Sequence, residues 1–194
     1  VVTVSVQKLF QEGENNFIRW KAQDLAGNGF VESEDYQIRV DSQDGKFLDP
    51  KPPFTSWNHG LNLTCSVRID DTGSGVDAPS IEFRTSSQGV SKYGPWKSAN
   101  WTASGISVTP SIWSIFVPGP SNFIEWRAKD NAGNQFESNN YQINIDNDPP
   151  IMEGCKPNST KVHTTDTITC EVTITDAGGA GVDLASMQYA ISTD

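Results

Sequence analysis

The sequence predicts an all-β protein made of tandem repeats, and three observations support this prediction. Valine and isoleucine together number 28 of the 194 residues, against only 6 leucines. Such β-branched side chains fit a pleated sheet better than a helix. Apolar and polar residues alternate in several short segments bounded by Gly, Pro, Asn and Asp, as is typical of half-buried strands. The chain also resembles itself at a separation of about 105 residues.

The repeat is visible in two blocks of sequence. FIRWKAQDLAGN at 17–28 returns as FIEWRAKDNAGN at 123–134, and YQIRVD returns as YQINID. The second block begins LTCSVRIDDTGSGVD at residue 63 and returns as ITCEVTITDAGGAGVD, so that Cys65 is matched by Cys170. A unit of about 105 residues has the size of one β-sandwich domain.

The order of the two blocks determines the expected domain map. The 17–28 block stands near the start of the chain, whereas its counterpart follows the block that contains Cys65. We therefore expect residues 1–47 to be the C-terminal half of a repeat, residues 48–147 a complete repeat, and residues 148–194 the N-terminal half of a third. Each half alone would expose an apolar face, so we expect both to lie inside complete sandwiches. Either the other half of a second copy completes them head to tail, or neighbouring sequence completes them in a longer covalent array.

Strands and turns of the complete repeat follow from alternation and turn chemistry. The inner face of its first clear strand carries Leu63, Cys65, Val67 and Ile69. The run DDTGSGVD at 70–77 is expected to be a turn, because its glycines allow positive φ and its carboxylates can accept backbone N–H groups. Further strands are expected at 81–85, 107–117, 124–129 and 141–145, the last two separated by the turn DNAGN.

The spacing Ile124-x-Trp126-x-Ala128-x-Asp130-x-x-Gly133 resembles the sixth strand and following turn of fibronectin type III and related immunoglobulin-like sandwiches. A D-x-A-G-N turn, a Y-x-I-x-I-D strand and then Asp-Pro-Pro resemble the tandem immunoglobulin-like repeats of prokaryotic, notably archaeal, surface and adhesion proteins. The resemblance covers the whole chain as half, whole and half repeats. It implies tandem immunoglobulin-like or fibronectin III-like β-sandwiches, and an extracellular location at the cell surface, while the fold itself hosts many unrelated roles.

Charge and motifs argue against several classes of function. A net charge of −10 without a Lys/Arg cluster argues against a nucleic-acid groove or an anionic membrane surface. No stretch approaches the roughly eighteen apolar residues of a membrane span. The two histidines, His59 and His163, lie in no nucleophile motif, and phosphate-loop and dinucleotide fingerprints do not occur. We therefore expect no enzyme activity, no nucleic-acid binding and no membrane insertion of this segment.

Aspartates gather where the repeats are expected to join. Ca²⁺ takes about six to eight oxygen ligands, and carboxylates from a linker and two turns could supply them while stiffening the junction. The alternative is that each aspartate caps its own turn on a solvated acidic surface. The candidate calcium residues are Asp44, Asp49, Asp70, Asp71, Asp77 and Asp130 at one junction, and Asp146, Asp148, Asp176 and Asp183 at the next.

Cys155 and Cys170 are expected to form a disulfide. They flank a turn around His163, and the strands on either side of that turn would run antiparallel with the sulfur atoms opposed. A disulfide would suit an extracellular protein. The alternative is that Cys170, like Cys65 at the equivalent place, is a small buried core residue.

Glycosylation and sugar stacking are two further expectations. Three sequons occur, at Asn62, Asn100 and Asn158, a number that chance alone explains. Each asparagine is a candidate for a glycan in an archaeal or eukaryotic host. Four tryptophans either seal loops against the sandwich or stack on sugars, namely Trp57, Trp96, Trp101 and Trp113.

The expected function is structural and adhesive. The chain would belong to an extracellular rod or filament of head-to-tail sandwiches, with neighbouring copies of itself as partners and glycans as further possible partners. Two alternatives stay open: a carbohydrate-binding accessory module of a secreted hydrolase, and the ligand-sensing exterior of a receptor.

Overall fold

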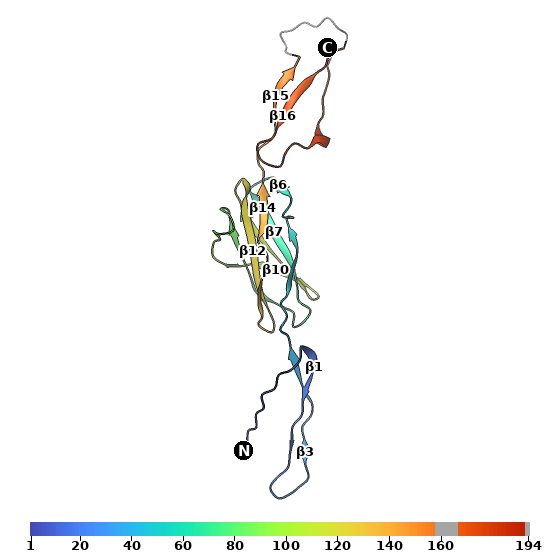
Figure 1. Cartoon of the computed structure of the whole chain (residues 1–194), viewed down its shortest axis with the longest axis vertical. Coiled ribbons are helices and arrows are strands. Elements are labelled where there is room, and N and C mark those ends of the chain that lie inside the picture. The colour runs from blue at the N-terminus through green and yellow to red at the C-terminus, as the bar shows by residue number, and fades with distance from the viewer. Residues whose placement is uncertain (158–166, 193–194) are drawn as a thin grey trace.

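The computed structural model describes residues 1–157 and 167–192, and it confirms that the chain is built from β-structure (Figure 1). Its only helical element among these residues is a short 3-10 turn, η1 (Leu184–Ser186). Three parts follow one another along the chain. We call residues 1–40 the N-terminal segment, residues 46–145 the central sandwich, and residues 151–157 with 167–192 the C-terminal segment.

The central sandwich consists of two sheets. One has the strand order β10-β11-β7-β5, and the other has the order β6-β14-β12-β8-β9, with β13 beside β12. The strands are β5 (Lys46–Lys51), β6 (Trp57–Asn58), β7 (Asn62–Asp70), β8 (Val76–Ser86), β9 (Lys97–Ser98), β10 (Asn100–Ser104), β11 (Ser107–Ile115), β12 (Gly119–Asp130), β13 (Gln135–Glu137) and β14 (Tyr141–Ile145). All pairings are antiparallel except that of β6 with β14.

One hydrophobic core lies between these two sheets. Cys65, Val67 and Ile69 alternate along β7 and are buried, as the sequence predicts, and they share the core with residues of β8, β11, β12 and β14. Trp126 at its centre is only 1% exposed, and its ring lies 5.9 Å from that of Phe83. Alternation along β7 therefore places these apolar side chains inside, with Ser66 and Arg68 on the outer face.

The N-terminal segment contains two short antiparallel ladders. They pair β1 (Gly13–Ile18) with β4 (Tyr36–Val40), and β2 (Lys21–Ala22) with β3 (Val31–Glu32). Residues 1–10 form no strand.

The C-terminal segment contains a single ladder. It joins β15 (Ile151–Lys156) to β16 (Glu171–Thr175). η1 follows, with Asp183 as its N-cap.

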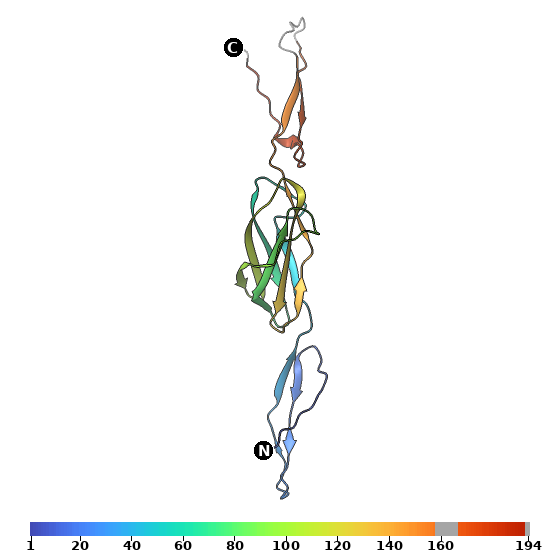
Figure 2. The same cartoon turned by 90° about the vertical axis from the view of Figure 1, so that its left-hand side faces the viewer.

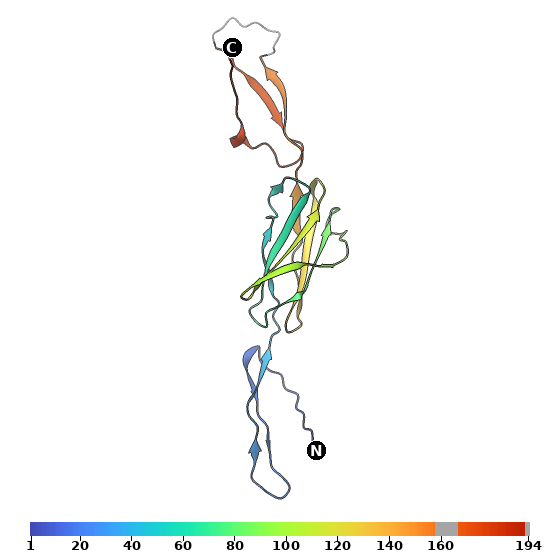
Figure 3. The ribbon, with the colours of Figure 1, turned by 180° about the vertical axis from the view of Figure 1, so that it is seen from behind.

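The two outer segments lie at opposite ends of the central sandwich (Figure 1, Figure 2 and Figure 3). Within the single chain neither segment, as far as its residues are described, is part of a complete sandwich. The expectation that residues 1–47 and 148–194 lie inside complete sandwiches concerns a second copy or neighbouring sequence and stays a prediction. Trp20 is 38% exposed, although its counterpart Trp126 is buried.

The expected disulfide between Cys155 and Cys170 is wrong for this structure, because both thiols are free. The cause is the register of the β15–β16 ladder. Lys156 lies opposite Glu171, so continuing the antiparallel ladder sets Cys170 beside Pro157 and not beside Cys155. Disulfide geometry requires the two Cβ atoms to lie within about 4.5 Å and to face one another.

Candidate functional site

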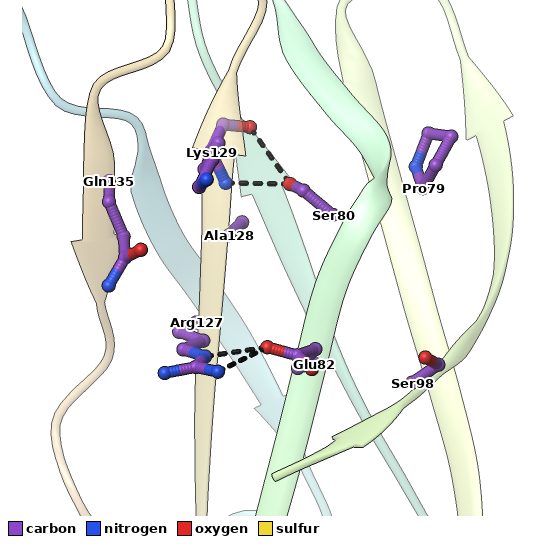
Figure 4. Close-up of a pocket in the computed structure, with 8 residues that line it drawn as sticks. All are labelled: Pro79, Ser80, Glu82, Ser98, Arg127, Ala128, Lys129 and Gln135. Carbon is purple, nitrogen blue, oxygen red and sulfur yellow. Dashed lines mark hydrogen bonds and ion pairs between the residues drawn. The ribbon is translucent and has the colours of Figure 1, made fainter.

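A small polar pocket lies on the outer face of the sheet formed by β8 and β12 (Figure 4). It has a volume of about 270 Å³. The Arg127 guanidinium binds the Glu82 carboxylate at 2.6 Å, and the Ser80 hydroxyl accepts a hydrogen bond from the backbone N–H of Lys129. Neither histidine nor cysteine lines this pocket. The Arg127–Glu82 ion pair and the hydrogen bond to Ser80 each join β8 to β12 across the floor of the pocket.

A ladder of arginine and aromatic side chains covers the same face. The Trp96 ring stacks with two guanidinium groups, those of Arg84 and Arg127, each 4.4 Å from the ring centre. Arg84 also stacks on Tyr93 at 4.7 Å and forms an ion pair with Glu125 at 2.6 Å. Burial raises the pKa of the Tyr93 phenol to about 12. Trp96 therefore seals the loop that carries it against the sheet.

Three carboxylates meet at the junction between the N-terminal segment and the central sandwich. Asp41 comes from the linker, Asp71 from the β7–β8 turn and Asp130 from the end of β12. One oxygen of each lies within 4.8 Å of the other two, and Asp71 and Asp130 are buried. The sequence predicted Asp71 and Asp130 as part of such a group and missed Asp41. The repeat could have identified Asp41, because Asp41 ends the segment YQIRVD at the position where Asp146, which was predicted, ends YQINID.

Backbone N–H groups surround this aspartate group. Asp41 accepts hydrogen bonds from the backbone of Ser74 at 2.6 Å and of Gln43 at 3.1 Å. Hydrogen bonds from Ser74 hold the pKa of the Asp41 carboxyl below its usual value. Asp71 accepts from the backbone of the β7–β8 turn, and Asp130 from Asn134. Each carboxylate therefore caps a turn, and their oxygens are also the ligand type that Ca²⁺ prefers.

The remaining aspartates predicted for this junction lie apart from the group. Asp49 and Asp70 both bind the Arg68 guanidinium on the outer face of β7, which offsets part of their negative charge. Asp44 is exposed and Asp77 lies in β8, and neither joins the three-carboxylate group. Strand alternation explains the separation of Asp70 from Asp71, because neighbouring residues point to opposite faces.

The second junction repeats part of the same pattern. The Asp146 carboxylate accepts hydrogen bonds from the backbone of Asp148 at 3.0 Å and of Ala180 at 2.8 Å. Asp176 accepts from the backbone of Gly181. Asp183 is the N-cap of η1. Beside them lies a cavity of about 520 Å³ lined by Trp57 and Pro149, among others.

The sequons and the tryptophans are distributed over the central sandwich and beyond it. Asn62 lies exposed on β7, opposite Ile115 of β11, and Asn100 lies exposed on β10. Asn158, like His163, is outside the residues that the structure describes. Trp57 is half-buried at the second junction, whereas Trp101 and Trp113 are exposed, the latter by 63%.

Neither a protein-family model nor a curated protein matches the chain. Over residues 1–157 and 167–192, no helix is long and apolar enough to cross a membrane.

Proposed function

We propose that this chain is a structural, non-catalytic segment of an extracellular tandem-repeat protein, in which immunoglobulin-like sandwiches follow one another as a surface rod or filament with an adhesive role. The observation that most supports this proposal is the path of the chain. It enters the central sandwich at one end through β5 and leaves it at the other through β14, with the outer segments beyond those ends (Figure 1 and Figure 2). A unit entered and left at opposite ends extends a structure along one axis.

The junctions support this proposal. Each linker carboxylate, Asp41 or Asp146, is hydrogen-bonded to the turn of the following unit. Asp41 is further tied through its carbonyl oxygen, which accepts from the Asn134 amide at 3.0 Å. A linker fixed at several points limits bending between successive units, as a rod requires.

Self-association completes the proposed rod. The N-terminal and C-terminal segments correspond to complementary parts of a sandwich, so that the C-terminal segment of one copy and the N-terminal segment of the next would form a further sandwich. This contact joins two different surfaces head to tail, which produces an open fibre or a ring according to the rotation between copies.

Small-angle scattering over a range of protein concentrations tests the rod. We expect the maximum dimension to increase with concentration while the cross-sectional radius stays constant. The same measurement with added Ca²⁺ or with chelator tests the aspartate group, because a bound ion would stiffen the junction. A cross-section that widens in step with the length would contradict the rod.

A second function is favoured by one observation. Trp113 is 63% exposed on the outer face of β11, opposite Thr64 of β7, and Ile115 on the same face is 62% exposed. A flat exposed indole beside hydroxyl groups can stack on a sugar ring. Fluorescence titration with a panel of oligosaccharides tests this function. Trp113→Ala should abolish any quenching, whereas Trp96→Phe should leave it unchanged.

A further inference from the structure

The two outer faces of the central sandwich differ in how their tryptophans are covered. On the face of β8 and β12, the Trp96 ring stacks with two guanidinium groups and is half-buried. On the face of β7 and β11, Trp113 and Ile115 are exposed by 63% and 62% and lie two residues apart on one strand. Single exposed apolar residues are common on proteins, whereas neighbouring ones indicate an interaction site.

A glycosylation sequon lies directly beside this apolar pair. Asn62 and Thr64 are exposed on the outer face of β7, whereas Leu63 between them packs against the core. In the β7–β11 ladder, Asn62 lies opposite Ile115. Thr64 lies opposite Trp113 in the same ladder. The acceptor asparagine and the hydroxyl residue of its sequon therefore share one face with both exposed apolar side chains.

A second sequon borders Trp113 from the other side. Asn100 is exposed on β10 and lies opposite Ser111, which precedes Trp113 by two residues on β11. β11 itself lies between β7 and β10 in this sheet. The exposed indole thus stands between two acceptor asparagines, each on a neighbouring strand. The number of sequons carries no weight, but their position beside an uncovered indole does.

The acceptor asparagines differ from the asparagines that hold the fold together. The buried Asn122 side chain donates to two backbone carbonyl groups at 2.8 and 3.1 Å, and Asn134 donates to a carboxylate at 2.7 Å. Within the described part of the chain, no such hydrogen bond engages the side chain of Asn62 or Asn100. Both side-chain nitrogens are therefore accessible for modification.

The surface around Trp113 fits a neutral carbohydrate. The chain as a whole carries a net charge of −10, and the opposite face of the sandwich is covered by ion pairs such as Arg127–Glu82. A sugar can pack here without removing water from a charged group, which would be costly. The outward positions beside the indole carry hydroxyl groups instead, at Thr64, Ser66, Thr102, Thr109 and Ser111.

We propose that Asn62 carries an N-linked glycan whose innermost sugar packs on Ile115 and Trp113. Side chains directly opposite one another in a ladder have Cβ atoms about 5 Å apart, and diagonal neighbours lie about 7–8 Å apart. A sugar ring on the Asn62 side chain therefore covers Ile115 and reaches the Trp113 indole. The apolar face of the indole packs against the C–H groups of the ring.

This inference goes beyond the rod and rests only on the extracellular location proposed above, where N-linked glycans occur. The donor is a lipid-phosphate-linked oligosaccharide. The Asn62 Nδ2 atom forms a bond to the anomeric carbon of the first sugar, and the bond from that carbon to the phosphate oxygen breaks. The amide loses one proton and the lipid phosphate is the leaving group, so that no electron transfer is needed.

Mass spectrometry of the protein purified from the cells that make it tests the modification. The peptide that contains Asn62 should carry added sugar mass. Asn62 found without added mass would overturn the proposal. Binding of free oligosaccharides by Trp113 would then be the remaining source of carbohydrate on this face, so the second function proposed above would still stand.

Thermal unfolding tests the packing. The full chain is secreted from a eukaryotic host that adds N-linked glycans, and Asn62→Gln is compared with the unsubstituted chain. Loss of the glycan should lower the melting temperature of the central sandwich by about 4 °C, as expected for one stacked ring. The same substitution in chain made without glycans gives the effect of the side chain alone. Asn100→Gln is the matched control and should have a smaller effect, because Asn100 lies opposite Ser111.

A double-mutant cycle with Trp113→Ser identifies the indole as the contact. In that background the glycan-dependent shift from Asn62→Gln should fall below about 1 °C, which is at least fourfold less. An equal shift with and without the indole would overturn the packing even where Asn62 is modified. Sugar mass on Asn62, together with a shift that disappears in Trp113→Ser, would support the proposal.

Discussion

Two tryptophans at equivalent positions offer a controlled measure of what core formation contributes to stability. Trp126 and Trp20 each donate their backbone N–H to a serine hydroxyl at the same point of the strand. They differ in exposure, 1% against 38%. Replacing each in turn by alanine removes the same side chain from a filled core and from an open one.

The expected magnitudes differ widely. Trp126→Ala should cost about 3–5 kcal/mol of unfolding free energy, because it removes a large buried side chain and leaves a cavity. Trp20→Ala should change the unfolding of the central sandwich by less than about 0.5 kcal/mol at concentrations where the chain is monomeric. If the N-terminal segment completes a second copy, Trp20→Ala should weaken association by a comparable 3 kcal/mol, which is about 150-fold in Kd.

Urea unfolding followed by circular dichroism at low protein concentration measures the first two values, and sedimentation equilibrium measures the third. Trp126→Phe serves as a milder variant, since it keeps a ring in the core and should lose less stability if the alanine variant does not fold. Equal losses of stability for Trp126→Ala and Trp20→Ala in the monomer would refute the argument. They would mean that the local strand geometry, and not burial, determines the energy.

Three further predictions concern single groups. Burial raises the pKa of the Cys65 thiol to about 12, so iodoacetamide at pH 8 should modify Cys155 and leave Cys65 intact in the folded chain. The pKa of the Asp41 carboxyl is lowered in the folded state, so the hydrogen bond from Ser74 to the ionised carboxylate should be fully formed above the unfolded-state pKa of about 3.9. It should be lost as the pH falls through the lower folded value, which hydrogen exchange of the Ser74 amide would report. Gly73→Ala would place a Cβ 2.5 Å from the Asp41 carboxylate. It should therefore release the linker and increase the bending at the junction, which small-angle scattering would measure. Unchanged bending would show that the Asp41 contact does not stiffen the junction.

Alternation predicted much of the fold because the central sandwich buries one face of β7, β8, β11, β12 and β14. The assignment of Cys65, Val67 and Ile69 to the core follows directly from period two, and the structure agrees. Trp20 aligns with the buried Trp126 but is 38% exposed in the single chain, since alternation identifies an apolar face but not the partner that covers it.

Contacts between distant segments were the main source of error. The disulfide expectation for Cys155 and Cys170 assumed a register that the β15–β16 ladder has on neither side of the irregularity between Glu153 and Lys156. The stacking of Trp96 with two arginines depends on how a loop folds back over the sheet, and no local pattern encodes that. Of the candidate metal residues at the first junction, Asp71 and Asp130 meet because both lie at the same end of the sandwich. Asp49 and Asp70 instead form ion pairs with Arg68 on a strand face.

The entry and exit of the chain at opposite ends of the central sandwich also determine how the molecule would respond to tension. A pull on the two linkers acts along β5 in one sheet and along β14 in the other. Hydrogen bonds in an antiparallel ladder run perpendicular to the strands, so this pull loads all the bonds of the β5–β7 ladder in shear at once. A pull perpendicular to the strands would instead break these hydrogen bonds one at a time. A segment built in this way would transmit force along its axis with little extension until a whole strand slides.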